Sequence, residues 1–200
     1  KKMKLNLKFV NKIPSQSGQN EIIFLKQKNL KIKDLKSLEK SIFSSKLFIE
    51  LKFLKKDYNN KSYVFVNCTT SKISLDFEKL GSKLFSFLKD NKIGNSKILD
   101  SNNSLTALQL EKILHGLQLK SYEFTKYKTY KKNRDTDINL NVVGSSTKKN
   151  NFTRYKHNAL LNGVYLTRDL VSEPGNILHP DEYAKRISKL RKYGLKVKIY

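Results

Sequence analysis

The sequence is poor in cysteine, which cross-links chains, and in proline and glycine, which interrupt helices and strands. It holds one cysteine, three prolines and eight glycines in 200 residues, and no tryptophan. The single thiol, Cys68, excludes an internal disulfide and any zinc site built from several cysteines. Because Cys68 lies in the apolar run SYVFVNC, we expect a buried structural thiol. A chain without disulfides suits a reducing compartment, and we expect a cytoplasmic protein.

Long apolar stretches are also missing. No run of 18 apolar residues exists that could span a bilayer, so the sequence predicts no membrane partner. Residues 1–16 are positively charged, but their apolar residues alternate with polar ones and no apolar core follows. This segment therefore does not resemble a signal peptide. The chain begins with Lys-Lys and not with Met, which suggests a fragment.

Acidic residues and arginine are scarce, whereas lysine is abundant. The chain has 41 Lys and Arg against 17 Asp and Glu, a formal charge of +24, and only five of its basic residues are arginines. Such a charge raises nucleic acid or an anionic membrane as a partner. Arginine is the better fork for phosphate, however, and the lysines are spread along the whole length. Diffuse, solvated lysines are therefore favoured over a dedicated polyanion site, with DNA binding as the alternative.

Strand and helix patterns alternate through the first 150 residues. Apolar runs with β-branched residues or period-two alternation predict strands at 4–10, 20–27, 62–69, 96–100 and 137–144. Apolar residues at helical spacing predict helices at 74–94, with Gly94 as the stop, and at 104–120. Residues 34–54 remain open between helix and strand, and 126–137 reads as a loop. This alternation predicts an α/β fold, a mostly parallel sheet with flanking helices.

The last fifty residues have a different pattern of predicted helices and strands. A long helical pattern covers 152–172, and Pro174 ends it. Pro180 suits the first position of a new helix that Gly194 closes, and the following LKVKIY alternates like a strand. Because these pieces cannot bury a core by themselves, we expect three parts. They are an α/β domain at 1–150, a connector helix at 151–173, and the beginning of a truncated second α/β domain at 174–200.

The sequence carries no familiar catalytic signature. Neither a GxGxxG, a P-loop, an HExxH, a CxxC nor a GxSxG motif is present. The three histidines, at 115, 157 and 179, lack metal-ligand spacing, so a surface or packing role is favoured for each. We therefore predict no catalytic, metal or cofactor-binding residue in this chain from the residues alone.

Weaker candidates each have a simpler explanation. The acidic pair Asp181 and Glu182 sits where the helix dipole favours negative charge. The pair Asp135 and Asp137 could grip a cation, but solvated carboxylates explain it as well. Residues 121–132 interleave Tyr, Phe and Lys, a mix that can stack bases, although the signal is unspecific.

Two stretches resemble a known family. EKILHGLQLKSYEFTKYKT (111–129) and LTRDLVSEPGNILHPDEYAKRI (166–187) are similar to segments of the leucyl aminopeptidase family, also called cytosol aminopeptidases. The matching residues of the first are Gly116, Leu119, Ser121, Tyr122, Phe124, Lys126, Tyr127, Lys128 and Thr129, and those of the second are Arg168, Asp169, Leu170, Val171, Glu173, Pro174, Asn176, Pro180 and Tyr183. The departures are Glu123, Thr125 and His179, which takes the place of a capping Thr.

The resemblance implies an N-terminal domain similar in topology to macro domains, joined by a long helix to a catalytic domain. It implies a hexameric exopeptidase that uses two divalent ions, zinc, manganese or magnesium, to release N-terminal amino acids such as leucine from peptides. The family's metal ligands, including those of its NTDAEGR motif, would follow residue 200. We therefore expect 1–200 alone to be inactive and to serve assembly. A stand-alone binding module is disfavoured, and no Gly-rich loop supports ADP-ribose binding.

Overall fold

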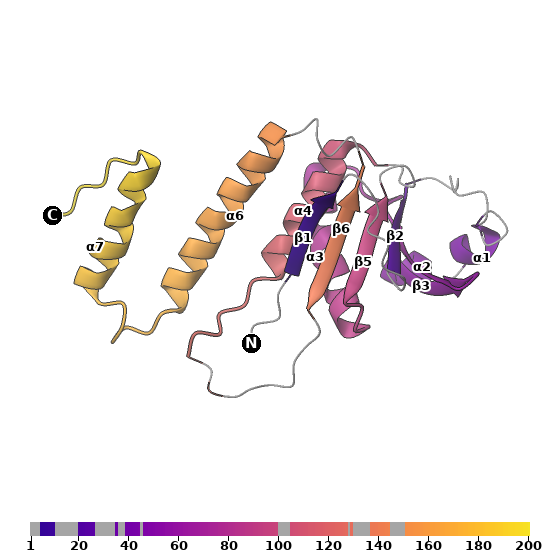
Figure 1. Ribbon diagram of the computed structural model, residues 1–200, viewed down its shortest axis with the longest axis horizontal. Helices are drawn as coiled ribbons and strands as arrows, with labels where there is room; N and C mark the ends of the chain where they lie inside the picture. Colours follow the sequence, from indigo (N-terminus) through magenta and orange to yellow (C-terminus); the bar gives the residue numbers. More distant parts are fainter. Residues whose placement is uncertain are drawn as a thin grey trace. The chain divides into compact units, whose positions relative to one another are not determined.

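The computed structural model describes residues 5–10, 20–26, 35, 39–44, 46–99, 105–127, 129, 137–144 and 151–200, without the side chains of 39, 40, 47, 51 and 151–154. The chain forms two compact units, 1–157 and 158–200 (Figure 1).

A six-stranded sheet organises the first unit. Its strands are β1 (Leu5–Val10), β2 (Asn20–Leu25), β3 (Phe53–Tyr58), β4 (Lys61–Asn67), β5 (Asn95–Leu99) and β6 (Ile138–Val143). They lie in the order β1-β6-β5-β2-β4-β3, and every neighbouring pair is parallel except β3 and β4. The prediction of an α/β fold with a mostly parallel sheet is confirmed, as are the five strands expected from the apolar runs.

The segment left open in the sequence, 34–54, contains two short helices and the beginning of a strand. Helices α1 (Glu39–Phe43) and α2 (Lys46–Leu51) precede β3. Asn59 and Asn60 both adopt positive φ, 48° and 57°, between β3 and β4. A two-residue turn of this kind joins antiparallel strands whose twist it matches. The sequence prediction missed β3 because Lys55 and Lys56 interrupt its alternation at an edge of the sheet.

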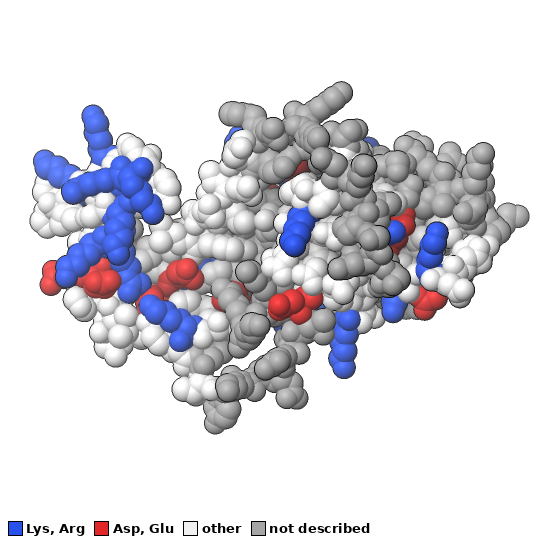
Figure 2. Space-filling view, viewed as in Figure 1, with Lys and Arg blue, Asp and Glu red and all other residues white. Residues whose placement is uncertain are grey.

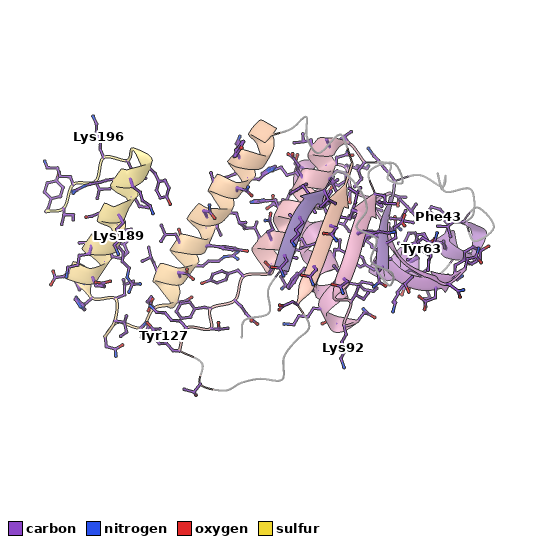
Figure 3. The ribbon with its side chains drawn as sticks, viewed as in Figure 1. Phe43, Tyr63, Lys92, Tyr127, Lys189 and Lys196 are labelled. Atoms are coloured by element: carbon purple, nitrogen blue, oxygen red, sulfur yellow. The ribbon has the colours of Figure 1, made fainter. Side chains whose placement is uncertain are left out.

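Side chains of the central strands alternate between two separate cores. Ile22 and Phe24 of β2 pack with α3 (Ser74–Asp90) and α4 (Ala107–Lys120) on one face. Ile23 and Leu25 pack on the other face with residues of α1 and α2. Figure 3 shows Phe43 and Tyr63 on this second side. Both faces of the sheet are therefore covered, as expected for parallel strands.

Helices α3 and α4 approach each other at two glycines. A Cβ atom built on Gly81 would lie 1.9 Å from the carbonyl oxygen of Ile113. One built on Gly116 would lie 1.9 Å from the carbonyl oxygen of Glu78. Because these contacts are to backbone, any larger side chain at either glycine must push the helices apart.

The end of α3 differs from the sequence prediction. The helix ends at Asp90, and Lys92, not Gly94, adopts the left-handed conformation at φ 54°. The N–H of Ile93 donates to the carbonyl of Leu88 over 2.8 Å, and the N–H of Lys92 donates to the carbonyl of Lys89 over 3.0 Å. This is a Schellman ending, fixed by the apolar contact of Ile93 and Leu88 in the core.

The second unit contains most of α6 (Asn151–Ser172), then α7 (Pro180–Ser188) and the 3-10 helix η3 (Lys189–Tyr193). The helix stop before Pro174 and the closing Gly194, at φ 82°, agree with the sequence prediction. The strand predicted for LKVKIY is wrong, because residues 195–200 carry no regular structure. A strand needs a partner for its backbone groups, and no described strand pairs with this segment.

Among the described residues, no helix is long and apolar enough to cross a bilayer.

Candidate functional site

Buried titratable groups gather where α3, α4 and the beginning of α6 meet. His115 of α4 and His157 of α6 are 6% and 7% exposed. Their rings stack, with centroids 5.0 Å apart and planes inclined by 25°. The sequence prediction of packing histidines holds for both residues, but it treated them separately. Since 42 residues separate them along the chain, only the tertiary fold brings them together.

Two carboxylates and one lysine border the histidine pair. Oε2 of Glu78 lies 3.4 Å from Nδ1 of His115 and 3.8 Å from Nζ of Lys112. Oε2 of Glu111 lies 3.8 Å from Nδ1 of His157. The cluster therefore brings two histidines, two carboxylates and one lysine together in a partly buried setting.

The environment favours neutral His157. Burial lowers its pKa below the ordinary value, and the positive charge of Lys112 together with His115 lowers it further. Glu78 opposes this effect more weakly. Nε2 of His115 and Nδ1 of His157 are buried without a hydrogen-bond partner within the described structure. The two imidazoles pack face to face, and protonating His157 would place a charge where little water can reach it.

The cluster does not fit a metal centre. Stacked imidazoles direct their lone pairs along parallel planes, so the two rings cannot converge on one ion. In the part of the chain that the structure describes, no group of three or more His, Cys, Asp and Glu residues could hold a metal. The residues present do not match a two-metal peptidase site, and no catalytic step is derived from them.

The remaining candidates from the sequence belong to other segments of the chain. His179 occupies the N-cap of α7 without a side-chain cap bond, and Asp181 and Glu182 lie in the first turn. Glu182 accepts a 2.9 Å bond from Nε of Arg186, which lowers its pKa. The helix-terminal explanation of this acidic pair agrees with these contacts. Asp137 is exposed, whereas Asp135 lies outside the described residues.

Cys68 is fully buried at the end of β4, as the sequence predicts. Its thiol lies 3.7 Å from the carbonyl of Val66. Burial raises its pKa to about 12, against smaller lowering effects of a hydrogen bond with Leu25 and of nearby lysines. A thiol with so high a pKa stays protonated at neutral pH and is a poor nucleophile.

The aromatic and basic segment 121–132 is described only at 121–127 and 129. Phe124 and Tyr127 contact each other with centroids 5.8 Å apart, and Nζ of Lys126 lies 5.3 Å from the Tyr127 ring centre. These aromatic residues therefore contact each other within the chain. The side chain of Arg154, a basic residue that could also contact DNA phosphates, lies outside the described residues.

Two curated relatives of the chain carry the same name. The probable cytosol aminopeptidase of Nitrobacter winogradskyi is 33% identical over 142 residues, 68% of this chain and 28% of that protein. The one from Bradyrhizobium sp. is 40% identical over 99 residues, 48% of this chain and 19% of that protein. The chain thus spans less than a third of the length of either relative. No protein-family model matches it.

Two solved structures have a similar fold. A mutant of tomato leucine aminopeptidase aligns with a TM-score of 0.66 at 18% identity, over 96% of this chain and 43% of that one. The bottromycin maturation enzyme BotP, in complex with Mn, aligns with a TM-score of 0.59 at 12% identity, over 89% of this chain and 37% of that one. Together with the sequence relatives, these likenesses agree with the motif resemblance at 111–129 and 166–187. The chain belongs to the leucyl aminopeptidase family and corresponds to part of the length of its members.

Proposed function

We propose that the chain is the N-terminal portion of a metal-dependent leucyl aminopeptidase that releases N-terminal amino acids, preferably leucine, from peptides. The observation that carries this proposal is the 33% identity to a probable cytosol aminopeptidase over 68% of the chain. The mostly parallel sheet, similar in fold to the tomato enzyme, agrees with it. The cytosolic name of the relatives supports a cytoplasmic location.

Metal dependence is part of the same proposal. The BotP structure was determined in complex with Mn, which supports divalent ions in the whole protein. The described residues of this chain offer no fitting ligand set. We therefore place two ions, manganese, zinc or magnesium, with residues beyond 200. When bound, such ions would polarise the scissile carbonyl and activate water.

This division of labour gives 1–200 a structural role. In the proposed arrangement, 1–150 is the macro-like domain, 151–173 is the connector and 174–200 opens the catalytic domain. The macro-like domain would contribute to a hexameric assembly and to substrate access. The contact division at residue 157 supports a boundary within the beginning of α6.

The activity of the isolated chain tests the absence of catalytic residues. Purified 1–200 is incubated with a chromogenic leucine amide in the presence of Mn²⁺, Zn²⁺ or Mg²⁺. The expected rate equals that of the ions alone, because the described residues offer no ligand set for them. Leucine release above this background, which disappears with a chelator, would show that the chain itself carries a catalytic centre.

DNA binding is the second candidate, and one feature of the surface favours it. Basic side chains gather over α7 and the residues after it (Figure 2). They are Lys185, Arg186, Lys189, Arg191, Lys192, Lys196 and Lys198. A dedicated site predicts that binding to duplex DNA falls with a log-log salt slope of about −0.9 per phosphate contact. Binding that vanishes at moderate salt and depends on no single basic residue would leave only diffuse attraction.

A further inference from the structure

A small cavity lies beside the carboxyl end of β4, and neither histidine of the stacked pair is among its described lining residues. Its volume is about 290 Å³. Its walls come from Lys52 before β3, from the segment after β4, and from the first half of α3. The lining residues are Lys52, Thr70, Ser71, Asp76, Lys79, Leu80, Ser82 and Lys83. Ligands of open α/β sheets bind outside the carboxyl ends of the parallel strands, and this cavity has that position.

The segment after β4 is ordered by hydrogen bonds. Buried Asn67 accepts bonds at its side-chain oxygen from the N–H and the hydroxyl of Thr69, over 3.0 and 2.6 Å. The N–H of Cys68 donates to the carbonyl of Leu25 on the neighbouring strand, over 2.8 Å. The N–H of Ser71 donates back to the carbonyl of Cys68. Thr70 and buried Ser71 are therefore held in the wall of the cavity before any ligand arrives.

Lys52 is held in an unfavourable backbone conformation. Its φ is 65°, in the left-handed region that non-glycine residues rarely occupy. Its carbonyl accepts a 2.8 Å bond from the N–H of Asn67, and its ammonium donates a 2.9 Å bond to the hydroxyl of Thr70. These contacts fix both ends of the residue at the cavity. Glycine would adopt this backbone conformation with less strain. Lysine at this position is strained, but it supplies an ammonium group to the cavity.

The cavity carries an excess of positive charge. Three ammonium groups line it, from Lys52, Lys79 and Lys83, against one carboxylate, that of Asp76. That carboxylate already accepts bonds from the backbone N–H groups of Lys72 and Ile73, over 2.9 and 3.1 Å. Asp76 thus caps the start of α3, and its charge, which interacts with Lys79 and Lys52, offsets only one of the three ammonium groups among the described lining residues. Hydroxyl groups of Thr70, Ser71 and Ser82 add neutral donors.

We propose that this cavity is a binding site for a small anion carrying one or two phosphate groups, held by Lys52, Lys79 and Lys83. Ammonium groups bind phosphate as point charges, and hydroxyls can complete the hydrogen bonding of a tetrahedral group that has several oxygens. The volume is at the lower end of ligand cavities, which excludes large ligands from full burial. This site goes beyond peptide hydrolysis, since none of its residues is part of the proposed catalytic function.

The test compares two Lys→Gly variants of the full chain. Lys52→Gly removes a cavity ammonium while glycine keeps the left-handed backbone. Lys92→Gly removes an exposed lysine with nearly the same φ, 54°, that points away from the body of the unit at the end of α3 (Figure 3). Both changes remove one charge and relieve one strained φ, so a difference between them reports the cavity alone.

Inorganic pyrophosphate is titrated at constant ionic strength, and amide NMR shifts of residues 70–83 report binding. We expect saturable shifts, a dissociation constant raised about tenfold by Lys52→Gly, and an unchanged constant for Lys92→Gly. Lys79→Gln should weaken binding in the same direction, which keeps the test informative if Lys52→Gly perturbs the fold. No saturable shifts, or equal effects of the two glycine variants, would overturn the proposal.

A duplex DNA titration distinguishes a free phosphate ligand from a nucleic acid backbone. If Lys52→Gly weakens pyrophosphate binding but leaves duplex binding unchanged, the small-ligand site is supported. If it weakens duplex binding as strongly as pyrophosphate binding, the lysines serve a polyanion and the small-ligand proposal fails.

Discussion

Burial of His157 makes the free energy of unfolding depend on pH. Its folded pKa lies below its unfolded value because of burial, Lys112 and His115. The unfolded chain therefore binds the proton more readily than the folded chain. The stabilising effect is present above the unfolded pKa, about 6.5, and is lost as pH falls toward the folded pKa. Glu78 and Glu111 face the pair, and the charge of Glu78 acts against this loss more weakly.

This linkage predicts a measurable pH dependence. Urea unfolding of the wild-type chain at pH 7.5 and 5.5 should give a lower free energy of unfolding at the lower pH. His157→Gln should reduce the difference, because it removes the titrating ring. His179→Gln, at an exposed helix cap, is the control and should leave the difference unchanged. An identical pH dependence in wild type and His157→Gln would contradict the assignment.

Lys92 offers a second prediction at the level of one residue. Because its φ is 54°, Lys92→Gly should raise the free energy of unfolding by about 0.5–1 kcal/mol. The same change three residues earlier, Lys89→Gly, lies inside α3 and should lower it by about 0.5–1 kcal/mol. Chemical denaturation of both variants measures the opposite signs. A loss of stability in Lys92→Gly would show that its side chain contributes more than its backbone costs.

At the scale of elements, the crossing of α3 and α4 depends on glycine. Gly116→Ala should destabilise the first unit by about 1–3 kcal/mol or more, because the added methyl meets the backbone of α3. Gly163→Ala in α6 is the matched control, since a Cβ there meets nothing within 4 Å. It should stabilise its helix by about 0.5–1 kcal/mol. Thermal unfolding that shows equal effects of the two changes would contradict the close helix contact.

The second unit is tied together by Arg186. Its Nη1 donates to Glu173 after α6 and its Nε donates to Glu182 of α7, each over 2.9 Å. Glu173, part of the family motif, has a side chain only 3% exposed. Arg186→Gln should therefore speed amide hydrogen exchange at 174–178, whereas Lys185→Gln should not. Unchanged exchange in Arg186→Gln would mean that the turn is held without this ion pair.

The sequence predicted elements best where one face is buried. Phe77, Leu80 and Leu84 give α3 a clear helical period, and all three are buried. It failed where tertiary contacts decide the outcome. At the end of α3, burial of Ile93 in the core favours the left-handed conformation at Lys92, where the sequence predicted it at Gly94. The LKVKIY segment alternates like a strand, but no described strand pairs with it.

The sites were harder to predict than the fold. The histidine pair and the lysine-lined cavity join residues far apart in the chain, for which no local motif exists. Lys52 at the cavity has a positive φ, which is a property of the backbone. The sequence does not predict it, because Lys52 is one lysine among many in this chain. The absence of catalytic ligands from this chain remains a prediction.

At the scale of the whole molecule, the chain belongs to a family whose members are much longer than 200 residues. The chain resembles probable cytosol aminopeptidases but spans only 28% of the length of the Nitrobacter relative. Peptide hydrolysis is therefore proposed for a longer polypeptide, in which 1–200 provides the sheet domain and the α6 and α7 helices.

The most direct test expresses the reading frame that continues beyond the codon for Tyr200 and assays its product with a leucine amide. We expect metal ligands in the added residues, and leucine release that a chelator abolishes and Mn²⁺ or Zn²⁺ restores. A stop codon directly after Tyr200, or an extended product that stays inactive with every ion, would contradict it.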